Sequence, residues 1–242
     1  PIVTDSVISN NSSRGIYVSG GGITIATSTI SNNSSVGISA NYARSAVTIT
    51  NSTITGNSGS GIEFGSAYSG SSLTVATSTI SNNSGTGISI YGPNTALAFT
   101  IANNTISNNS GDGLSYSNSS IDYVSSPLPS ITNNTITGNS NEGIELGGSY
   151  ALAIINYNNL YENSGSYDLK SYVTAQEVDA RYNYWGLTST AIMGIATNPK
   201  DIPRIYDYHD NVSYSLVNYA AWLSEVGGSP VQEVGTTATA GL

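Results

Sequence analysis

A short motif recurs along most of the chain, and no other feature of the sequence limits the fold as strongly. Each copy has an aliphatic residue among small polar ones, then Asn-Ser, then Gly and alternating aliphatics. The copies are SVISNNSSRGIYV, STISNNSSVGISA, STITGNSGSGIEF, STISNNSGTGISI, NTISNNSGDGLSY and NTITGNSNEGIEL, with a degenerate seventh, NNLYENSGSYDLK. Internal repeats of a few tens of residues are typical of solenoids, propellers and arrays.

The central aliphatic residues, here called the anchors, are spaced 22, 24, 26, 26, 30 and 24 residues apart. A strand with period-two alternation precedes each anchor, and another follows the Gly, whereas no repeat has helical periodicity. The pattern predicts an all-β fold, a single-stranded parallel β-helix of about eight coils over residues 1–186, the last marked by Ala180 and Trp185. The anchors are Ile8, Ile30, Ile54, Ile80, Ile106, Ile136 and Leu160.

An Asn follows each anchor by three residues, at a corner between strands. Asn tolerates left-handed backbone angles, and stacked amides hydrogen-bond to one another, so we interpret this column as a structural ladder and not as a binding strip. The ladder residues are Asn11, Asn33, Asn57, Asn83, Asn109, Asn139 and Asn163. In the degenerate seventh repeat we expect Leu169, not Asp168, to face inward.

The repeats resemble those of the right-handed parallel β-helix family, which includes pectate-lyase-like proteins and many bacterial and archaeal surface proteins. The segment VDARYNYWG, residues 178–186, resembles the closing coil of the surface-type members. Residues 202–223 are similar to their C-terminal cover. The resemblance implies a capping segment at 187–226, in which Trp222 and Leu223 plug the last coil. Residues 227–242 are predicted to be a flexible tail or linker.

Composition excludes several classes of function. The net charge is −9, and no Lys or Arg lies between Arg44 and Lys170. A nucleic-acid binder needs a basic stripe, so we expect no nucleic-acid partner. No apolar run has the length of a membrane span, so we expect no membrane insertion. Without cysteine there is no thiolate site, and Asp207-Tyr208-His209-Asp210 is interpreted as capping structure. We expect no metal and no cofactor.

The resemblance implies one set of candidate catalytic residues, because family lyases and hydrolases need clustered carboxylates. Asp112 and Glu142 share a column in adjacent coils, and Glu145 lies on the strand after Glu142. No Arg or Lys occurs in coils three to six, so a lyase would lack its base. Our prediction is that the chain has no catalytic residues; if it is an enzyme, these three acids are the candidates.

Tyrosine is the most suggestive feature for binding, since one occurs in each coil shortly after the third strand. Aromatic rows can stack on sugar rings or anchor a protein, and they can equally shield the ends of strands. Both interpretations stay open. The candidate ligand-binding residues are Tyr17, Tyr42, Tyr68, Tyr91, Tyr116 and Tyr150.

Two hypotheses about function follow. The first is a non-enzymatic structural or adhesive solenoid, extracellular or at the cell surface, that binds carbohydrate or forms a filament or array. The second is a carbohydrate-active enzyme, a polysaccharide hydrolase or lyase. Because Pro1 enters the first predicted coil directly, we also expect head-to-tail self-association through uncovered strand edges.

Overall fold

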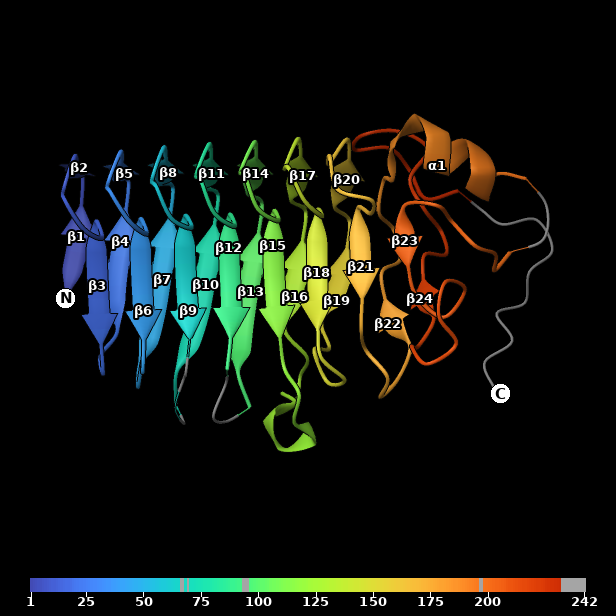
Figure 1. The fold of residues 1–242 in the computed structure, drawn as a ribbon, viewed down its shortest axis with the longest axis horizontal. Helices are drawn as coiled ribbons and strands as arrows, with labels where there is room; N and C mark the ends of the chain where they lie inside the picture. Colours follow the sequence, from blue (N-terminus) through green and yellow to red (C-terminus); the bar gives the residue numbers. More distant parts are fainter. Residues whose placement is uncertain (66–67, 69, 93–95, 196–197, 232–242) are drawn as a thin grey trace.

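The protein is a rod wound from three parallel sheets, with a cap at its C-terminal end (Figure 1). The computed structural model describes residues 1–65, 68, 70–92, 96–195 and 198–231. Along the chain, one strand of each sheet follows the next, and every pair of neighbouring strands in the three sheets is parallel and belongs to successive coils. The predicted parallel β-helix is therefore confirmed.

Sheet A contains β1 (Ile2–Thr4), β4 (Ile23–Ala26), β7 (Ala46–Thr50), β10 (Ser72–Ala76), β13 (Ala98–Ala102), β16 (Ser130–Thr132) and β19 (Ile154–Asn156). Sheet B contains β2 (Val7–Ser9), β5 (Thr29–Ser31), β8 (Thr53–Thr55), β11 (Thr79–Ser81), β14 (Thr105–Ser107), β17 (Thr135–Thr137) and β20 (Asn159–Tyr161). Sheet C contains β3 (Ile16–Ser19), β6 (Ile38–Asn41), β9 (Ile62–Gly65), β12 (Ile88–Tyr91), β15 (Leu114–Ser117), β18 (Ile144–Gly147), β21 (Leu169–Ser171) and β23 (Ile205–Tyr206).

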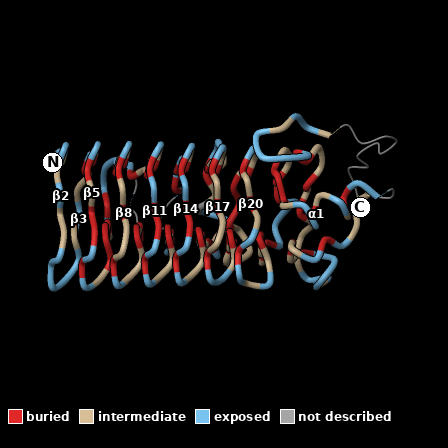
Figure 2. The backbone as a smooth tube through the Cα atoms, turned by 90° about the horizontal axis from the view of Figure 1, so that it is seen from above, coloured by how far each residue is buried: buried red, intermediate tan, exposed pale blue. Residues whose placement is uncertain are grey.

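The core is a set of stacked aliphatic columns inside the rod. The anchors occupy matching positions in sheet B, as in the pairs Ile30 with Ile54 and Ile80 with Ile106. From Ile30 to Leu160 they are fully buried. Buried segments recur at the same place in each coil (Figure 2). On most strands, alternation thus puts aliphatic side chains inside and Ser or Thr outside.

The number of complete coils is seven, one fewer than the sequence suggests. In the next turn β22 (Val178–Asp179) pairs with β24 (Val217–Asn218) of the cap and not with sheet A. Trp185 nevertheless continues the anchor column, because a bridge between Asn159 and Tyr184 sets it beside Leu160. The eighth turn keeps its interior residues but adds no strand to sheet A or sheet B.

The Asn ladder is confirmed. Each ladder Asn from Asn11 to Asn139 donates its Nδ2 to the Oδ1 of the Asn one coil further on, with distances of 2.8 Å from Asn11 to Asn33 and 3.0 Å from Asn109 to Asn139. The final donor, Asn163, meets the carboxylate of Asp168 at 2.9 Å instead of another amide. Leu169 faces inward opposite Ile144, as expected, but Asp168 is buried as well.

A second ladder, which the sequence analysis missed, runs along the corner between sheets A and B. It begins with serines, where the backbone N–H of Ser28 donates to Ser52 Oγ at 3.2 Å. It continues with asparagines, where Asn134 Nδ2 donates to Asn158 Oδ1 at 3.0 Å. Its members lie two residues before each anchor: Ser6, Ser28, Ser52, Ser78, Asn104, Asn134, Asn158 and Asn183.

The left-handed backbone angles do not fall on the ladder residues, which corrects our expectation. They fall on the residue immediately before each ladder position, such as Asn32 (φ 54°), Gly56 (φ 67°) and Asn108 (φ 56°). The same holds in the second ladder, where Thr27 and Thr77 have positive φ. One left-handed residue therefore turns the chain, and the next residue points its side chain inward into the ladder.

The C-terminal cap shares the core of the rod. It contains α1 (Gly186–Met193), β23 and β24, and Trp222 is buried in the same apolar cluster as the anchors. Leu223 is also buried and forms an antiparallel bridge with Pro230. The predicted tail therefore begins with residues that pack back against the cap, and its remainder, 232–242, lies outside the described residues.

Replacing Asn109 with Ala should destabilise the rod by about 3 kcal/mol, because it leaves buried polar groups without partners. Asn109 Oδ1 accepts from Asn83, and its Nδ2 donates to Asn139 and to the carbonyl of Ile80. Chemical denaturation measures the effect.

The matched control is Asn108→Gly at the adjacent exposed position. Two equivalent corners carry Gly56 and Gly138 with the same positive φ, so this variant should change stability by less than about 0.5 kcal/mol. Equal losses in the two variants would refute the assigned role of the ladder.

Candidate functional site

The outer face of sheet C gathers most of the candidate binding and catalytic residues. Every second side chain of each strand points away from the core, and parallel pairing aligns these outward side chains in rows along the rod. One such row, in register from β3 to β23, is Tyr17, Ser39, Glu63, Ser89, Ser115, Glu145, Lys170 and Tyr206. Ser89 and Ser115, in the middle of this row, separate two polar clusters that lie toward its two ends.

The first cluster, here called the tyrosine patch, consists of Tyr17, Tyr42, Tyr68 and Tyr91 with Arg14 and Arg44. All four tyrosines are exposed by between 37% and 53%. The rings of Tyr42 and Tyr68 are 6.3 Å apart between centroids. The arginines lie over two rings, Arg14 over Tyr17 at 5.0 Å and Arg44 over Tyr68 at 4.8 Å.

Tyr91 joins this patch across two coils. Its hydroxyl donates to Asn41 Oδ1 at 3.2 Å, and its ring lies over Gly65, where a Cβ would come within 2.5 Å of the ring. Burial and the Glu63 carboxylate raise the pKa of Tyr91, so its hydroxyl stays protonated at neutral pH. The patch therefore offers aromatic faces and cationic groups on one open surface.

Tyr116 is not part of any surface row, which corrects its assignment as a ligand-binding residue. It is 1% exposed and occupies an inward position of β15, edge-on to Phe99 with ring centroids 4.9 Å apart. Burial raises its pKa to about 12. Tyr116 lies three residues after Gly113, whereas Tyr17 lies two residues after Gly15. Because successive side chains of a strand point to opposite faces, this one-residue shift turns Tyr116 into the rod. Tyr150 is half-buried in a loop of a later coil.

The second cluster, here called the carboxylate cluster, brings together the three candidate acids. Asp112 Oδ1 accepts the backbone N–H of Glu142 at 3.2 Å. Burial, then the charges of Glu145 and Glu142, raise the pKa of Asp112 to about 6. The expectation that Asp112 and Glu142 share a column was right, and they lie close enough for the charge of Glu142 to act on the Asp112 carboxyl.

Lys170 is the functional residue that the sequence analysis missed. Its Nζ is 3.3 Å from Glu142 Oε1 and 3.7 Å from Glu145 Oε2. Burial acts to lower the pKa of Lys170, but the Tyr172 hydroxyl and Glu142 outweigh it and hold the pKa above its ordinary value. The ammonium is therefore a counter-ion to the acids and not a base ready to accept a proton.

Four tyrosines border the carboxylate cluster on the C-terminal side. Tyr206 lies among Tyr167, Tyr172 and Tyr214, with centroid distances of 5.0, 5.9 and 5.8 Å. Lys170 lies 5.4 Å from the ring centroid of Tyr172. The sequence could have shown that Lys170 lies near the acids, because Lys170 aligns with Glu145 of the preceding repeat. The seventh repeat lacks the Gly that marks this alignment in the other repeats.

The chemistry that the cluster supports is limited by its pairing. Lys170 forms ion pairs with Glu142 and Glu145, so both glutamates are held by a counter-ion. A proton held near pH 6 remains available for acid–base exchange.

The part of the chain that the structure describes contains no group of three or more His, Asp or Glu residues arranged to hold a metal ion. Asp207 uses its carboxylate to accept backbone N–H groups of His209 at 2.9 Å and Val217 at 2.8 Å. This segment thus has a structural role in the cap. Among the described helices, none has the length and apolarity needed to cross a membrane.

Comparison with known proteins agrees with the fold. The family model described as a right handed beta helix region matches residues 1–164. The chain therefore belongs to the right-handed β-helix family. No curated protein and no solved structure matches the chain.

The proton on Asp112 predicts a pH dependence. The folded state holds this proton up to about pH 6, and the unfolded chain releases it near 3.8, so the contribution to stability falls as pH rises between these values and is constant above them. Asp112→Asn removes this contribution. Its melting temperature relative to wild type should rise by several degrees from pH 4 to pH 7.

Asp122→Asn, at an exposed acid, serves as the control and should differ from wild type by the same amount at both pH values. A difference between Asp112→Asn and wild type that does not vary with pH would contradict the raised pKa of Asp112.

Proposed function

We propose that this protein is a non-enzymatic adhesive or structural solenoid that works outside the cell and binds carbohydrate through the tyrosine patch. The observation that carries the proposal is the assembly of four exposed tyrosines from four coils, with two arginines, on one open sheet face. Exposed aromatic rings stack on the apolar faces of sugars, and arginine supplies hydrogen-bond donors beside them.

The form of the rod supports this proposal. Two buried ladders and continuous pairing across seven coils give a stiff scaffold, and the outward rows are mostly uncharged Ser and Thr. Lys170 forms ion pairs with Glu142 and Glu145, so two of the three candidate acids have a counter-ion, as in a structural cluster. A rigid, polar, weakly charged rod suits display and adhesion.

Self-association remains part of the proposal, with one restriction. The cap pairs β23 with β21, so the edge of β21 in sheet C is occupied at the C-terminal end of the rod. End-to-end assembly would use β1, β2 and β3, the outermost strands of their sheets at the N-terminal end.

The second candidate is a carbohydrate-active enzyme, and one observation favours it. Asp112 has a pKa of about 6 and lies beside Glu142 and Lys170, with tyrosines at the border. A carboxyl that is protonated near neutral pH is the usual general acid of glycoside hydrolysis.

Binding to a polysaccharide panel tests the first candidate. The double variant Tyr17→Ala, Tyr91→Ala should weaken binding of the polysaccharide that wild type retains by about tenfold, since each lost stacking contact is worth about 0.5–1.5 kcal/mol. Tyr208→Ala, at an exposed tyrosine of the cap, is the control and should bind as wild type does. Equal affinity of the double variant would contradict the role of the patch.

A product assay on the same panel separates the candidates. We expect no release of reducing or unsaturated sugars by wild type above the level of Asp112→Asn and Glu142→Gln. Turnover by wild type that disappears in both variants would overturn the non-enzymatic proposal and establish the second candidate.

A further inference from the structure

Two rows of exposed asparagines run along the edges of sheet B, at the left-handed corners that precede the ladder residues. Seven corner residues are asparagines with φ between 48° and 58°, and all seven are exposed. The row between sheets A and B contains Asn51, Asn103 and Asn133, and the row between sheets B and C contains Asn10, Asn32, Asn82 and Asn108.

Each of these asparagines begins an Asn-X-Ser or Asn-X-Thr triplet in which X is not proline. The triplets are Asn-Ser-Thr from Asn51, Asn-Asn-Thr from Asn103 and Asn133, and Asn-Asn-Ser from the other four. This triplet is the acceptor sequence for N-linked glycans, which uses the asparagine amide and the hydroxyl two residues later. Whether a folded triplet can accept a glycan depends on which of its side chains are accessible.

The corner geometry presents the two side chains that an acceptor triplet needs and buries the one between them. After Asn103 come Asn104, which is 2% exposed and belongs to the second ladder, and Thr105, which is exposed on the outer face of sheet B. After Asn82 come the buried ladder residue Asn83 and the exposed Ser84. The buried residue is X, whose identity the acceptor sequence leaves open.

Two further triplets have the right sequence and the wrong environment. Asn33 and Asn118 also begin acceptor triplets, but they are 0% and 1% exposed. Asn33 donates its Nδ2 to Asn57 Oδ1 at 2.9 Å, and Asn118 donates its Nδ2 to the carbonyl of Tyr150 at 3.0 Å. A side-chain nitrogen that is bonded inside the rod cannot reach a glycan donor.

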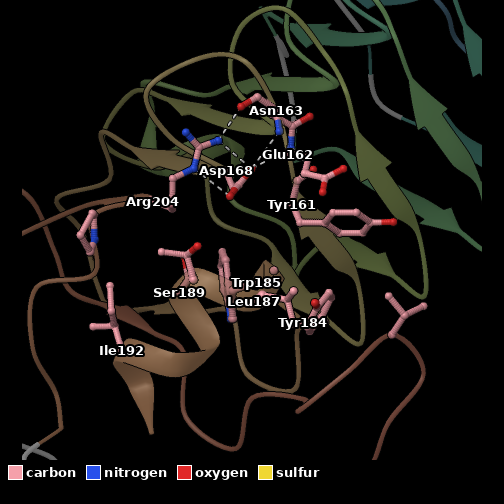
Figure 3. A pocket seen from close by; sticks show the side chains of 14 residues that line it. Tyr161, Glu162, Asn163, Asp168, Tyr184, Trp185, Leu187, Ser189, Ile192 and Arg204 are labelled. Atoms are coloured by element: carbon pink, nitrogen blue, oxygen red, sulfur yellow. Dashed lines mark hydrogen bonds and ion pairs between the residues drawn. The ribbon is translucent and has the colours of Figure 1, made fainter. Parts of the chain in front are cut away.

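A left-handed corner does not by itself require asparagine. Equivalent corners carry Thr27 and Gly56, both with positive φ. The last corner between sheets B and C carries Glu162, followed by Asn163, whose side chain hydrogen-bonds to Asp168 (Figure 3). The fold accepts several residue types at this position, so the backbone angle leaves the seven asparagines free for a further role.

We propose that the exposed corner asparagines are acceptors for N-linked glycans. The proposal rests on the extracellular location in the proposed function. In the transfer, the asparagine Nδ2 attacks the anomeric carbon of a sugar that is carried on a lipid pyrophosphate. The new carbon–nitrogen bond replaces the carbon–oxygen bond to the pyrophosphate, which leaves with the lipid, and the amide proton passes to a base of the transferase.

Asn51 is the acceptor with the least competition from its row. Successive corners are about 4.8 Å apart, so a glycan on one corner hinders transfer to the next. The neighbours of Asn51 are Thr27 and Thr77, and its Oδ1 accepts from Thr77 at 2.8 Å, whereas its Nδ2 has no hydrogen-bond partner among the described residues. The other six acceptors lie in adjacent pairs, so Asn51 should be the most fully modified.

The rows also lie away from much of the tyrosine patch. Tyr42 and Tyr68 are in the connections that follow sheet C, at the opposite end of its strands from sheet B (Figure 1). Glycans on the corners would therefore be attached along sheet B and not beside these two rings.

Transfer to the folded full chain tests the proposal, with a purified single-subunit oligosaccharyltransferase and a lipid-linked oligosaccharide as the probe. Intact mass should show at least one added glycan per chain. Glycopeptide mapping should place it mainly at Asn51, with occupancy of Asn33 and Asn118 lower by about tenfold or more because their amides are buried.

The matched variants are Thr53→Val and Thr53→Ser, at an outward position of β8 that leaves the core intact. Thr53→Val removes the hydroxyl of the triplet and keeps Asn51, so it should lower the occupancy of Asn51 by about tenfold or more. Thr53→Ser keeps the hydroxyl and should retain the occupancy within about twofold.

Absence of transfer to wild type while a control glycoprotein is modified would overturn the proposal. Occupancy of Asn33 and Asn118 equal to that of Asn51, or equal occupancy in Thr53→Val and Thr53→Ser, would also overturn it. Polysaccharide binding by the unmodified chain measures the tyrosine patch independently, so failure of either proposal is recognised without reference to the other.

Discussion

The hydrogen bonding between successive coils is the constraint on which the rest of the structure depends. Strands satisfy their own backbone groups in the sheets, but two corners of each coil are buried and need side chains to do so. Ladders of Ser and Asn supply those side chains, and each member pairs with the next coil. Since a ladder tolerates no change in length at its corner, the insertions collect in the third connection, from sheet C to the next strand of sheet A.

That restriction decides where function can develop. The connection after sheet C varies freely in length and provides Tyr42, Tyr68 and Tyr150, and the outward positions of sheet C provide Tyr17 and Tyr91. Parallel register then turns residues far apart in the chain into neighbours. The same register sets Glu145 beside Lys170, so the strongest charges on this face cancel one another.

The end of the rod follows from the same constraint. The last Asn of the first ladder needs an acceptor, and Asp168 provides one as a carboxylate, which in turn requires Arg204 from the cap. Arg204 cannot then serve a ligand. The anchor column ends in Trp185, whose indole N–H is buried and has no hydrogen-bond partner among the described residues.

The sequence by itself determined the fold, because period-two alternation and a fixed anchor-to-Asn distance leave only a parallel coil with an amide ladder. It also identified the acids and four of the exposed tyrosines. The odd spacing of Tyr116 from Gly113 already places its side chain inside the rod. Only the tertiary structure decided that Thr27 takes a left-handed angle and that Lys170 meets the acids. The position of Lys170 depends on the register of the seventh repeat, which lacks the Gly of the others. The backbone angle of Thr27 depends on contacts between coils, which the spacing within a single repeat does not encode.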